Sequence, residues 1–465
     1  ELDAGCPFIN AYCEERHGGK VACSWTPEKG RILTSCRAFR QGEVIFREPP
    51  LHIVAEQKDD EGFKRLQALR AEHPAAFEYE PLWYWTALCS LTKSQLPESA
   101  KGMRSISEDQ QKKLLLLYHS EVREAGAAAK LLVEKLGLGP NCQALDLERL
   151  LQVWILNCFE HSDEPLGYST YFMSSFMSHS CFPNAVWHYE GDEFVLRARA
   201  DIADEEEICV SYLSEDSLLE SVASRRKHLK DSKHFVCSCV RCTAAQDFSR
   251  GFKCPACAGE VFFCPRSSDG KAGGELAGQA CAKCARPVAA NEAERLLQEE
   301  RWLEAKLDGC ERRMERSAKS RSLLEPLQEA VARGEESLTQ HWLLDKSWQM
   351  LADLSDRGDQ HQEAEGFARK RIAFQERAYR GLSGTRAWTL EAYADMLVRH
   401  WNGKVEPSVQ VPDADAAQDL AAEAPKVYEA SLRILCHMFG EKHEYSTVVE
   451  RKLAELRREI KRHSG

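Results

Sequence analysis

Short apolar runs separated by turn residues fill residues 21–54 of the chain. Residues 31–35 and 44–48 are rich in β-branched and aromatic side chains, and a turn at Gly42 lies between them, before Pro49 ends the second run. Such runs between glycine and proline residues indicate β-strands. We therefore expect a hairpin-like unit of strands in this part of the chain.

The segment that follows changes to the spacing of helices. Ser107 and Gln110 form a capping box, which predicts a helix that begins there and runs to Gly137. A second helix is expected from an N-cap at Asp146 to about Asn157. The pattern thus indicates helices inserted between two groups of strands.

Strands return at residues 185–197 and 208–212, and the pattern is then helical almost throughout residues 292–465. Turn-forming residues interrupt this last segment at Gly358 and Asp359, at residues 381–384 and at residues 403–415. Helix pairs of this size suggest a repeat array, but irregular helical pairs explain the pattern nearly as well. The strands and helices together predict an α+β fold.

The size and charge of the chain narrow the classes of function. A length of 465 residues exceeds what one core organises, so about two to four domains are expected. The formal net charge of -11 argues against non-specific capture of nucleic acid and favours a basic partner, such as a Lys-rich peptide. No apolar run approaches the ~18 to 20 residues of a membrane helix, so we expect no transmembrane anchor.

The nineteen cysteines cluster at spacings typical of zinc sites rather than of a secreted disulfide framework. Cys237, Cys239 and Cys242 are close enough in sequence for three thiolates to meet one tetrahedral zinc ion at ~2.3 Å, and a fourth ligand is needed. Two C-x2-C knuckles follow with the pattern of a zinc ribbon, formed by Cys254, Cys257, Cys281 and Cys284. We therefore expect structural zinc ions and a reducing compartment.

Three motifs in a fixed order give the strongest indication of function. Residues 177–184 read Met-Ser-His-Ser-Cys-Phe-Pro-Asn, residues 206–212 read Glu-Glu-Ile-Cys-Val-Ser-Tyr, and residues 235–242 contain the C-x-C-x2-C cluster. This trio resembles the SET-domain protein lysine methyltransferases, and most closely their SMYD branch. The resemblance implies a knot-like strand arrangement that brings the first two motifs to one S-adenosylmethionine pocket.

The resemblance also implies roles for individual residues. Tyr212 matches the catalytic tyrosine, whose hydroxyl lies beside the transferred methyl group and helps to orient the acceptor amine. A strand tyrosine taken alone is more often a half-buried core residue. Cys181 is implied as the fourth ligand of the first zinc ion. The residues implied in cofactor binding are Lys29, Gly30, Arg31, Asn157, Ser178, His179, Tyr212 and Phe235.

Four positions depart from the family pattern. Ser178 replaces an asparagine that contacts the amino-acid end of the cofactor, and Ile32 stands at the second glycine of the opening loop. Glu205 replaces the usual glycine before the paired acids, and Lys233 stands where an aromatic residue often lines the lysine channel. Lys233 at this position leaves the aromatic wall of the channel, and so the number of methyl groups added, open. The four departures are Ser178, Ile32, Glu205 and Lys233. They also support a rival hypothesis, a catalytically weak scaffold that recruits protein partners.

SMYD proteins normally carry a MYND zinc module, but residues 51–150 contain only Cys89 and Cys142, too few cysteines for its two zinc sites. The chain is therefore most similar to members without this module, such as the apical complex lysine methyltransferases of apicomplexan parasites. The implied domains are an N-terminal SET segment at 1–56, a helical insertion at 57–144, the core SET region at 145–234, a post-SET zinc region with the zinc ribbon at 235–290, and a TPR-like helical domain at 291–465.

These features predict an S-adenosylmethionine-dependent protein-lysine N-methyltransferase. Direct methyl transfer needs a neutral amine, whereas a free lysine has a pKa near ~10.4. A desolvated channel and the positive sulfonium of the cofactor both disfavour the ammonium form. The expected substrate is a lysine-containing protein or peptide.

The expected partners follow from the same features. We expect further protein partners at the C-terminal helices and no membrane partner. A zinc ribbon can bind nucleic acid, but the sequence lacks dense basic and aromatic interleaving, so this alternative is the weaker one. The expected localisation is cytoplasmic, with association with the cytoskeleton or the nucleus left open.

Overall fold

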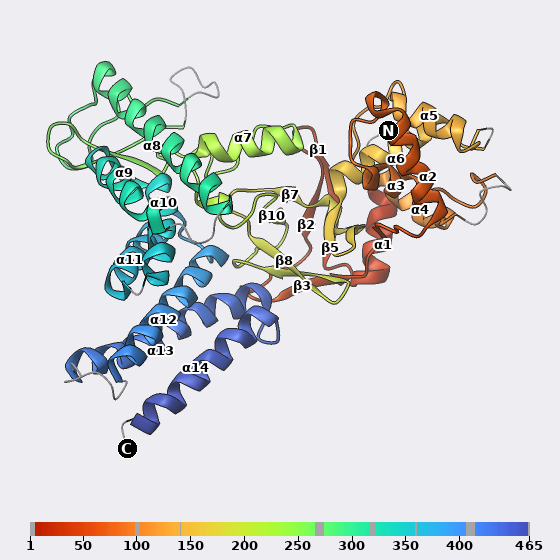
Figure 1. The fold of residues 1–465 in the computed structure, drawn as a ribbon. Coiled ribbons are helices and arrows are strands. Elements are labelled where there is room, and N and C mark those ends of the chain that lie inside the picture. The colour runs from red at the N-terminus through yellow and green to blue at the C-terminus, as the bar shows by residue number, and fades with distance from the viewer. Residues whose placement is uncertain are drawn as a thin grey trace.

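The computed structural model describes most of the chain. The described residues are 5–97, 103–139, 141–265, 274–316, 321–358, 360–405 and 414–463. Asp359 and residues 406–413, which belong to two predicted interruptions of the C-terminal helices, lie outside this set. Figure 1 shows helices around the N-terminus on one side, small sheets in the centre, and a C-terminal layer of helices that ends with α14.

The β part of the fold consists of five small sheets within the described residues. Strands form at the predicted residues 31–35 and 44–48, but they do not pair with each other as the predicted hairpin requires. Residues 31–35 lie in β2 (Gly30–Ser35), which pairs antiparallel with β1 (Val21–Thr26), whereas residues 44–48 pair with residues 194–197. The other strands are β3 (Val44–Glu48), β4 (His52–Ala55), β5 (Phe159–Asp163), β6 (Leu166–Thr170), β7 (Ser178–His179), β8 (Ala185–Glu190), β9 (Glu193–Ala198), β10 (Cys209–Val210), β11 (Arg250–Lys253), β12 (Glu260–Phe262) and β13 (Leu338–His341). Three sheets have the orders β3-β9-β8, β4-β6-β5 and β12-β11-β13, and β10 pairs parallel with β7.

The segment 205–210 is held between strands that are distant in sequence. The Ile208 N–H donates to the Leu33 carbonyl at 2.8 Å, and the Ser35 N–H donates to the Glu206 carbonyl at 2.9 Å. On its other side the segment pairs with β7 through β10. The second and first motifs of the sequence are thus brought side by side, over a buried apolar core that β2 and β9 share.

Glu205 forms the turn that leads into this segment. Its φ is 62°, in the left-handed region that glycine adopts without steric strain. The substitution of glutamate for the usual glycine therefore leaves the turn in place but strains it. We expect Glu205→Gly to stabilise the fold by about 1 kcal/mol, measured as a higher apparent Tm in thermal denaturation. Glu205→Ala removes the same charge but keeps a Cβ, so an equal gain in that variant would contradict the backbone explanation.

The helices before β5 surround a second core, in which Trp85 and Trp154 are fully buried. The capping box of Ser107 and Gln110 is confirmed, but the predicted single helix to Gly137 is wrong. The backbone turns extended at Leu117, the C-cap of α4, and helix resumes ten residues later in α5. These helices are α1 (Cys6–His17), α2 (Glu61–Glu72), α3 (Pro81–Cys89), α4 (Glu108–Leu116), α5 (Ala127–Lys135) and α6 (Ala144–Asn157).

The N-terminus of α6 also differs from its prediction. Gln143 is the N-cap, and Asp146 lies at the third helical position, where its side chain accepts from the Gln143 N–H in a reciprocal capping box. The helix begins earlier because both side chains then satisfy free N–H groups at its start. Its predicted end at Asn157 is confirmed.

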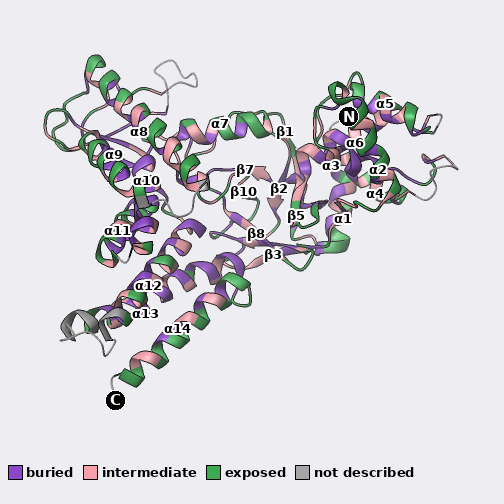
Figure 2. Cartoon of the chain, in the orientation of Figure 1, coloured by how far each residue is buried: buried purple, intermediate pink, exposed green. Residues whose placement is uncertain are grey.

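The C-terminal part is helical, as predicted, except for β13, which pairs with β11. A four-residue strand between two helices has too few positions to show a period, so the sequence pattern missed it. Figure 2 shows how buried and exposed residues alternate along these helices. None of the described helices is long and apolar enough to cross a membrane. The helices are α7 (Val222–Lys233), α8 (Ala290–Arg316), α9 (Leu324–Ser337), α10 (Trp342–Arg357), α11 (His361–Ala378), α12 (Gly384–Val405), α13 (Ala414–Phe439) and α14 (Glu444–His463).

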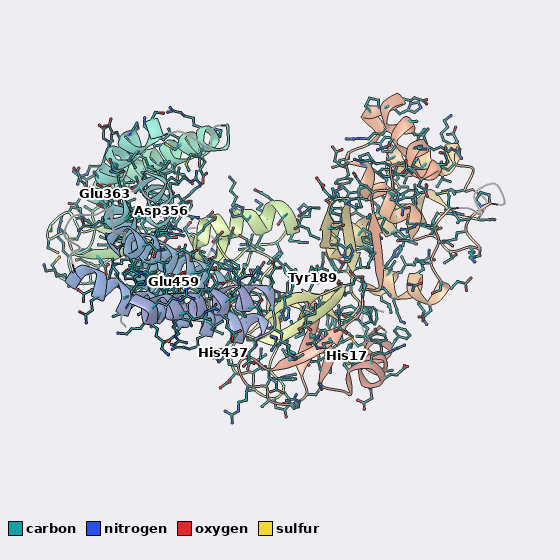
Figure 3. The ribbon with its side chains drawn as sticks, turned by 60° about the horizontal axis from the view of Figure 1, so that its bottom comes forward. His17, Tyr189, Asp356, Glu363, His437 and Glu459 are labelled. Carbon is teal, nitrogen blue, oxygen red and sulfur yellow. The ribbon has the colours of Figure 1, made fainter. Side chains whose placement is uncertain are left out.

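Polar contacts join the C-terminal helices to the central sheets. The buried Arg199 guanidinium binds the Glu215 carboxylate at 2.6 and 2.9 Å and donates from Nε to the Leu382 carbonyl at 2.8 Å. His437, labelled in Figure 3, lies in the last turn of α13. Its ring packs against Gly42, where an added Cβ would lie 3.4 Å from it. Because Arg199 directly follows β9 on the chain, its bond to Leu382, together with the Gly384 N–H bond to Glu215 at 2.8 Å, fixes the start of α12 against the sheet.

Two histidines lie at this junction and make it sensitive to pH. The ring of the buried His188 lies 4.9 Å from the ring of His443, and its Nε2 lies 3.4 Å from Glu190, beside the Arg197 guanidinium. Burial lowers the pKa of His188 to about 4, and burial also lowers the pKa of His443. Proton uptake therefore favours the unfolded state.

The stability that neutral His188 contributes is complete above the unfolded pKa of about 6.5 and is lost as the pH falls toward about 4. We expect the free energy of unfolding to fall by on the order of 2 kcal/mol between pH 7 and pH 5 from this residue. Thermal denaturation across that range measures it. His188→Gln should flatten the dependence, and an unchanged pH profile in that variant would contradict the assignment.

Candidate active site and zinc centres

Tyr212 follows β10 and lies at the centre of the predicted site. Its N–H donates to Nδ1 of His179 at 2.9 Å, and its hydroxyl donates to the Met177 carbonyl at 2.5 Å. The Phe235 ring stands perpendicular to the Tyr212 ring, with centroids 6.4 Å apart. Desolvation raises the pKa of Tyr212, so the phenol stays protonated at neutral pH. The hydroxyl is thus fixed inward, while 43% of the residue remains accessible.

His179 has protein partners at both ring nitrogens. Nδ1 accepts from the Tyr212 N–H, and Nε2 lies 3.2 Å from the Cys181 sulfur. Burial lowers the pKa of His179 to about 4, which keeps the ring neutral at neutral pH. Its side chain therefore links Tyr212 to the cysteine cluster, and its direct contact with a cofactor stays a prediction.

Glu207 connects two of the predicted cofactor-binding residues. Lys29 Nζ lies 2.8 and 2.6 Å from its two carboxylate oxygens, and the Ser178 hydroxyl donates a short hydrogen bond to it. Sequence reasoning gave Glu207 no role of its own. The paired acids Glu206 and Glu207 were visible in the sequence. The spacing of neighbouring residues could not show that Lys29, 178 positions earlier in the chain, binds Glu207.

Arg31 and Asn157 hold the backbone at the C-terminal end of α4, at residues 116 and 118. Arg31 donates to the Leu116 carbonyl at 2.5 Å, and its buried Nε has no hydrogen-bond partner among the described residues. The Asn157 amide donates to the Tyr118 and Val153 carbonyls, both at 2.7 Å. These side chains therefore position the wall of the site, and their contact with a cofactor stays a prediction.

Gly30 gives the opening loop an accessible backbone. Its φ is 71°, and a Cβ at this position would meet no atom within 4 Å. A side chain there would be strained by the backbone and would also project into this open space. The loop that begins with Lys29 can thus approach a ligand through its backbone.

The first cysteine cluster joins the first and third motifs. The sulfurs of Cys181, Cys237, Cys239 and Cys242 all lie within 4.8 Å of one another. Cys181 lies 4.0 Å from Cys237 and 3.5 Å from Cys242. Four sulfurs at ~2.3 Å from a tetrahedral zinc ion are about 3.8 Å apart, whereas a disulfide needs ~2.05 Å. This cluster therefore has the donor set and spacing that a zinc ion requires.

A buried cation lies beside this cluster. Arg225 is fully buried, and its guanidinium donates to the Cys242 sulfur at 3.8 Å. Four thiolates around one zinc ion carry a net negative charge, which such a cation offsets. The position of Arg225 thus favours thiolates over neutral thiols at this site.

The second cluster is formed by the two C-x2-C knuckles. The sulfurs of Cys254 and Cys284 lie 3.8 Å apart, those of Cys257 and Cys281 lie 3.6 Å apart, and all four lie within 4.8 Å of one another. A Cβ at Gly259 would lie 2.9 Å from the Cys281 sulfur. Glycine at this position lets the backbone pass close to the thiols, so this cluster also could hold a zinc ion.

The family model for the SET domain matches residues 30–213, which contain Tyr212, His179 and Glu207. This part of the chain is a SET domain. Within this SET domain, the matched span covers the strands from β2 to β10 and the helical insertion. The α+β fold class and the predicted SET domain are thereby confirmed, whereas the assignment to members without the MYND module stays a prediction.

Curated relatives match parts of the chain. The histone-lysine N-methyltransferase ASHR1 of Arabidopsis thaliana is 24% identical over 265 residues, which cover 47% of this chain and 54% of that protein. The protein-lysine N-trimethyltransferase SMYD5 of Homo sapiens is 40% identical over 83 residues, which cover 17% of this chain and 20% of that protein. The chain thus spans about half, or less, of the curated relatives it matches. It is homologous to SMYD-type and ASHR-type lysine methyltransferases.

Solved structures give only a weak overall likeness. The structure of Rubisco LSMT bound to AdoMet has a TM-score of 0.29 and 12% identity, covering 81% of this chain and 94% of that one. The SET domain of LSMT bound to lysine and AdoHcy has a TM-score of 0.30 and 11% identity, covering 98% and 93%. At these scores the overall likeness carries no argument about this chain.

Two further side chains hold the SET domain together around the site. Asn184 accepts from the Cys209 N–H at 2.8 Å and donates to the Glu207 carbonyl at 2.8 Å. Glu48 is fully buried and accepts from the N–H groups of Met173 and Ser174 at 2.8 and 3.1 Å. Asn184 is the last residue of the first motif, whereas no sequence signal pointed to Glu48.

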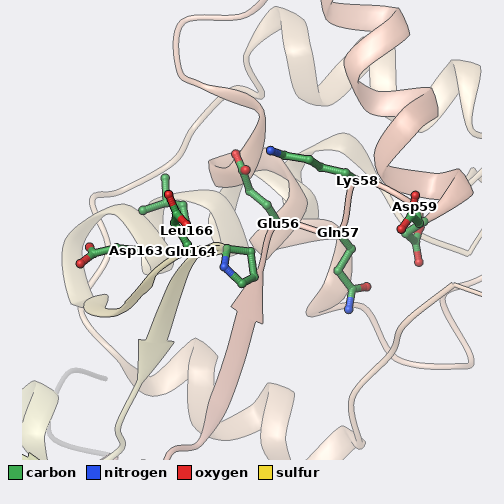
Figure 4. Close-up of a pocket in the computed structure, with 9 residues that line it drawn as sticks. Glu56, Gln57, Lys58, Asp59, Asp163, Glu164 and Leu166 are labelled. Carbon is green, nitrogen blue, oxygen red and sulfur yellow. The ribbon is translucent and has the colours of Figure 1, made fainter.

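The SET domain also has a surface hollow of about 900 Å³, drawn in Figure 4. Residues 56–60 after β4 and the turn between β5 and β6 line it, and its charged side chains are mostly carboxylates. None of the predicted site residues is among its lining residues. An acidic hollow without a bound group does not by itself indicate a site.

Proposed function

We propose that the chain is an S-adenosylmethionine-dependent protein-lysine N-methyltransferase. The observation that carries the proposal is the Tyr212 hydroxyl, fixed on the Met177 carbonyl at the crossing of the two motif segments. The relatives ASHR1 and SMYD5 are named as lysine methyltransferases, and this supports the same class of reaction. S-adenosylmethionine would supply the electrophilic methyl group.

The residues present fit such a cofactor. Gly30 leaves its loop backbone accessible, and Lys29 supplies a positive charge for a carboxylate. Phe235 supplies an aromatic face beside Tyr212. An aromatic face, a cation and free backbone groups are the features that a nucleoside with an amino-acid end requires.

The chain's own groups account for the handling of the acceptor amine. The Tyr212 oxygen donates its proton to the Met177 carbonyl and keeps lone pairs that can accept from a lysine N–H. The pKa of Tyr212 is raised by desolvation, and the same desolvation favours a neutral lysine in the site. The acceptor therefore loses its proton to water before transfer and is then oriented by fixed oxygens.

A specific observation favours the alternative, a protein-interaction scaffold with weak or no activity. The side chains of Lys29, Ser178, Asn157 and His179 all have protein partners. A cofactor must therefore either replace some of these contacts or bind through backbone groups. A lysine-containing protein as substrate, and further protein partners at the C-terminal helices, belong to the proposal in either form.

Two measurements separate these functions. Calorimetric titration with S-adenosylmethionine should give heat of binding, and labelled methyl from the cofactor should appear on lysines in a panel of Lys-bearing proteins. Heat-denatured protein is the control for non-enzymatic labelling. Absence of both heat and label would overturn the enzyme assignment and leave the scaffold. The cytoplasmic localisation is part of the proposal and is checked by imaging of the tagged protein.

A further inference from the structure

Lys233 ends α7 beside the proposed catalytic tyrosine. Its Nζ lies 5.9 Å from the centre of the Tyr212 ring, over the ring face, and it donates to the Leu156 carbonyl at 3.3 Å. Burial raises the pKa of Cys158 to about 11, and the Lys233 ammonium opposes this rise, so the cation also lies near that thiol. The lysine side chain thus reaches from α7 to the end of α6, across the tyrosine.

The surface of Tyr212 that remains for an acceptor is limited. The rings of His179 and Phe235 pack against it at 5.4 and 6.4 Å, and its hydroxyl is turned to the Met177 carbonyl. Even so, 43% of the residue is accessible. Lys233 places an ammonium group over one face of the ring within this region.

Stabilisation of its own helix does not account for this position. Basic side chains in the last turn of a helix offset the partial negative charge of its free carbonyls. The exposed Lys230 is also in the last turn of α7 and can serve this purpose. Lys233 instead donates to the Leu156 carbonyl, which belongs to α6.

We propose that Lys233 occupies the position of the acceptor lysine and that a substrate lysine must displace it. The inference rests on the proposed function, since it assigns the occupant of that same site. An aromatic face and a backbone carbonyl are groups that attract an ammonium ion, and Lys233 supplies one from within the chain. A substrate lysine carries the same group, so the two compete.

When Lys233 competes with the substrate, the apparent affinity equals the intrinsic affinity multiplied by the fraction of molecules in which the position is free. Removal of the occupant should therefore tighten binding. If Lys233 leaves the position free in about one molecule in ten, Lys233→Met should bind a lysine peptide about tenfold more tightly.

The experiment compares wild type, Lys233→Met and Lys230→Met, which remove equal charge from the same helical turn. The probe is a lysine decamer titrated calorimetrically without cofactor. We expect about tenfold tighter binding by Lys233→Met and binding within about twofold of wild type by Lys230→Met. Equal affinity in all three proteins would overturn the proposal.

A second measurement uses wild type alone and does not depend on the variant's folding. Lysines are acetylated with acetic anhydride, with and without the decamer, and the extent at each lysine is read by mass spectrometry. Displacement predicts that acetylation of Lys233 rises several-fold with the decamer, while that of Lys230 stays unchanged or falls. Unchanged or reduced acetylation of Lys233 would overturn the proposal.

These outcomes are separate from those that test the enzyme. In one outcome, wild type binds S-adenosylmethionine and transfers methyl, but Lys233→Met binds the peptide no more tightly. This outcome supports the enzyme function and contradicts the role proposed for Lys233. In the opposite outcome, Lys233→Met binds the peptide more tightly, but no variant gives heat of cofactor binding or transfers methyl. This outcome supports the occupied lysine site and contradicts the enzyme function.

Discussion

Tyr212→Phe lowers the rate of methyl transfer by about 100-fold or more, with little change in binding of S-adenosylmethionine. The expected loss follows from geometry, because the hydroxyl is the fixed oxygen that orients the acceptor amine, and misplacement by ~1 Å costs a similar factor. The phenylalanine ring keeps its contacts with His179 and Phe235, so the fold should be retained. Transfer of labelled methyl under single-turnover conditions measures the effect.

Tyr189→Phe is the matched control for this variant. The Tyr189 hydroxyl also donates to a backbone carbonyl, that of Glu160 at 2.8 Å, within the same domain. The Tyr189→Phe substitution also removes one phenolic oxygen, but outside the proposed site. The rate of methyl transfer by this variant should stay near that of wild type. Equal labelling by wild type and Tyr212→Phe would refute the role given to Tyr212.

Zinc removal is the change with the second-largest expected effect. The two cysteine clusters predict two zinc ions per chain by elemental analysis of the purified protein. Structural zinc ions bind with apparent free energies of about 10 to 16 kcal/mol, so the loss of one thiolate should empty its site at low free zinc. Cys239→Ser is therefore expected to retain one zinc ion and Cys284→Ser likewise one, each at the other cluster.

The two zinc variants should differ in activity. Cys181 contacts His179, and His179 holds the Tyr212 N–H, so the first cluster supports the proposed site directly. Cys239→Ser should lower methyl transfer by about tenfold or more, the cost typical of a lost supporting contact, whereas Cys284→Ser should lower it much less. Cys36→Ser, which changes an exposed thiol outside both clusters, is the control.

Two results would contradict this reading of the cysteines. A wild-type protein without zinc would mean that the thiols are unligated. Equal activity losses in Cys239→Ser and Cys284→Ser would mean that zinc acts on overall folding rather than through His179. Disulfide formation is already disfavoured by sulfur separations of 3.5 to 4.0 Å in the first cluster.

Short-range sequence patterns determined a large part of this protein. The strands β2 and β3, the capping box at Ser107 and the C-x2-C knuckles each depend on residues a few positions apart. Local backbone preference and ligand spacing act over that range, so the sequence shows them directly. The ordered motifs also predicted the SET domain, which the family match confirms.

Only the tertiary structure decided which distant groups meet. Glu207 receives Lys29 from the far end of the domain, Lys233 crosses to Leu156 over Tyr212, and β13 leaves a helical segment to pair with β11. None of these contacts has a local period, because each depends on how separate elements pack against one another. The sequence by itself therefore determined the elements and the chemistry they carry, whereas packing decided the partners of each side chain and the occupant of the tyrosine face.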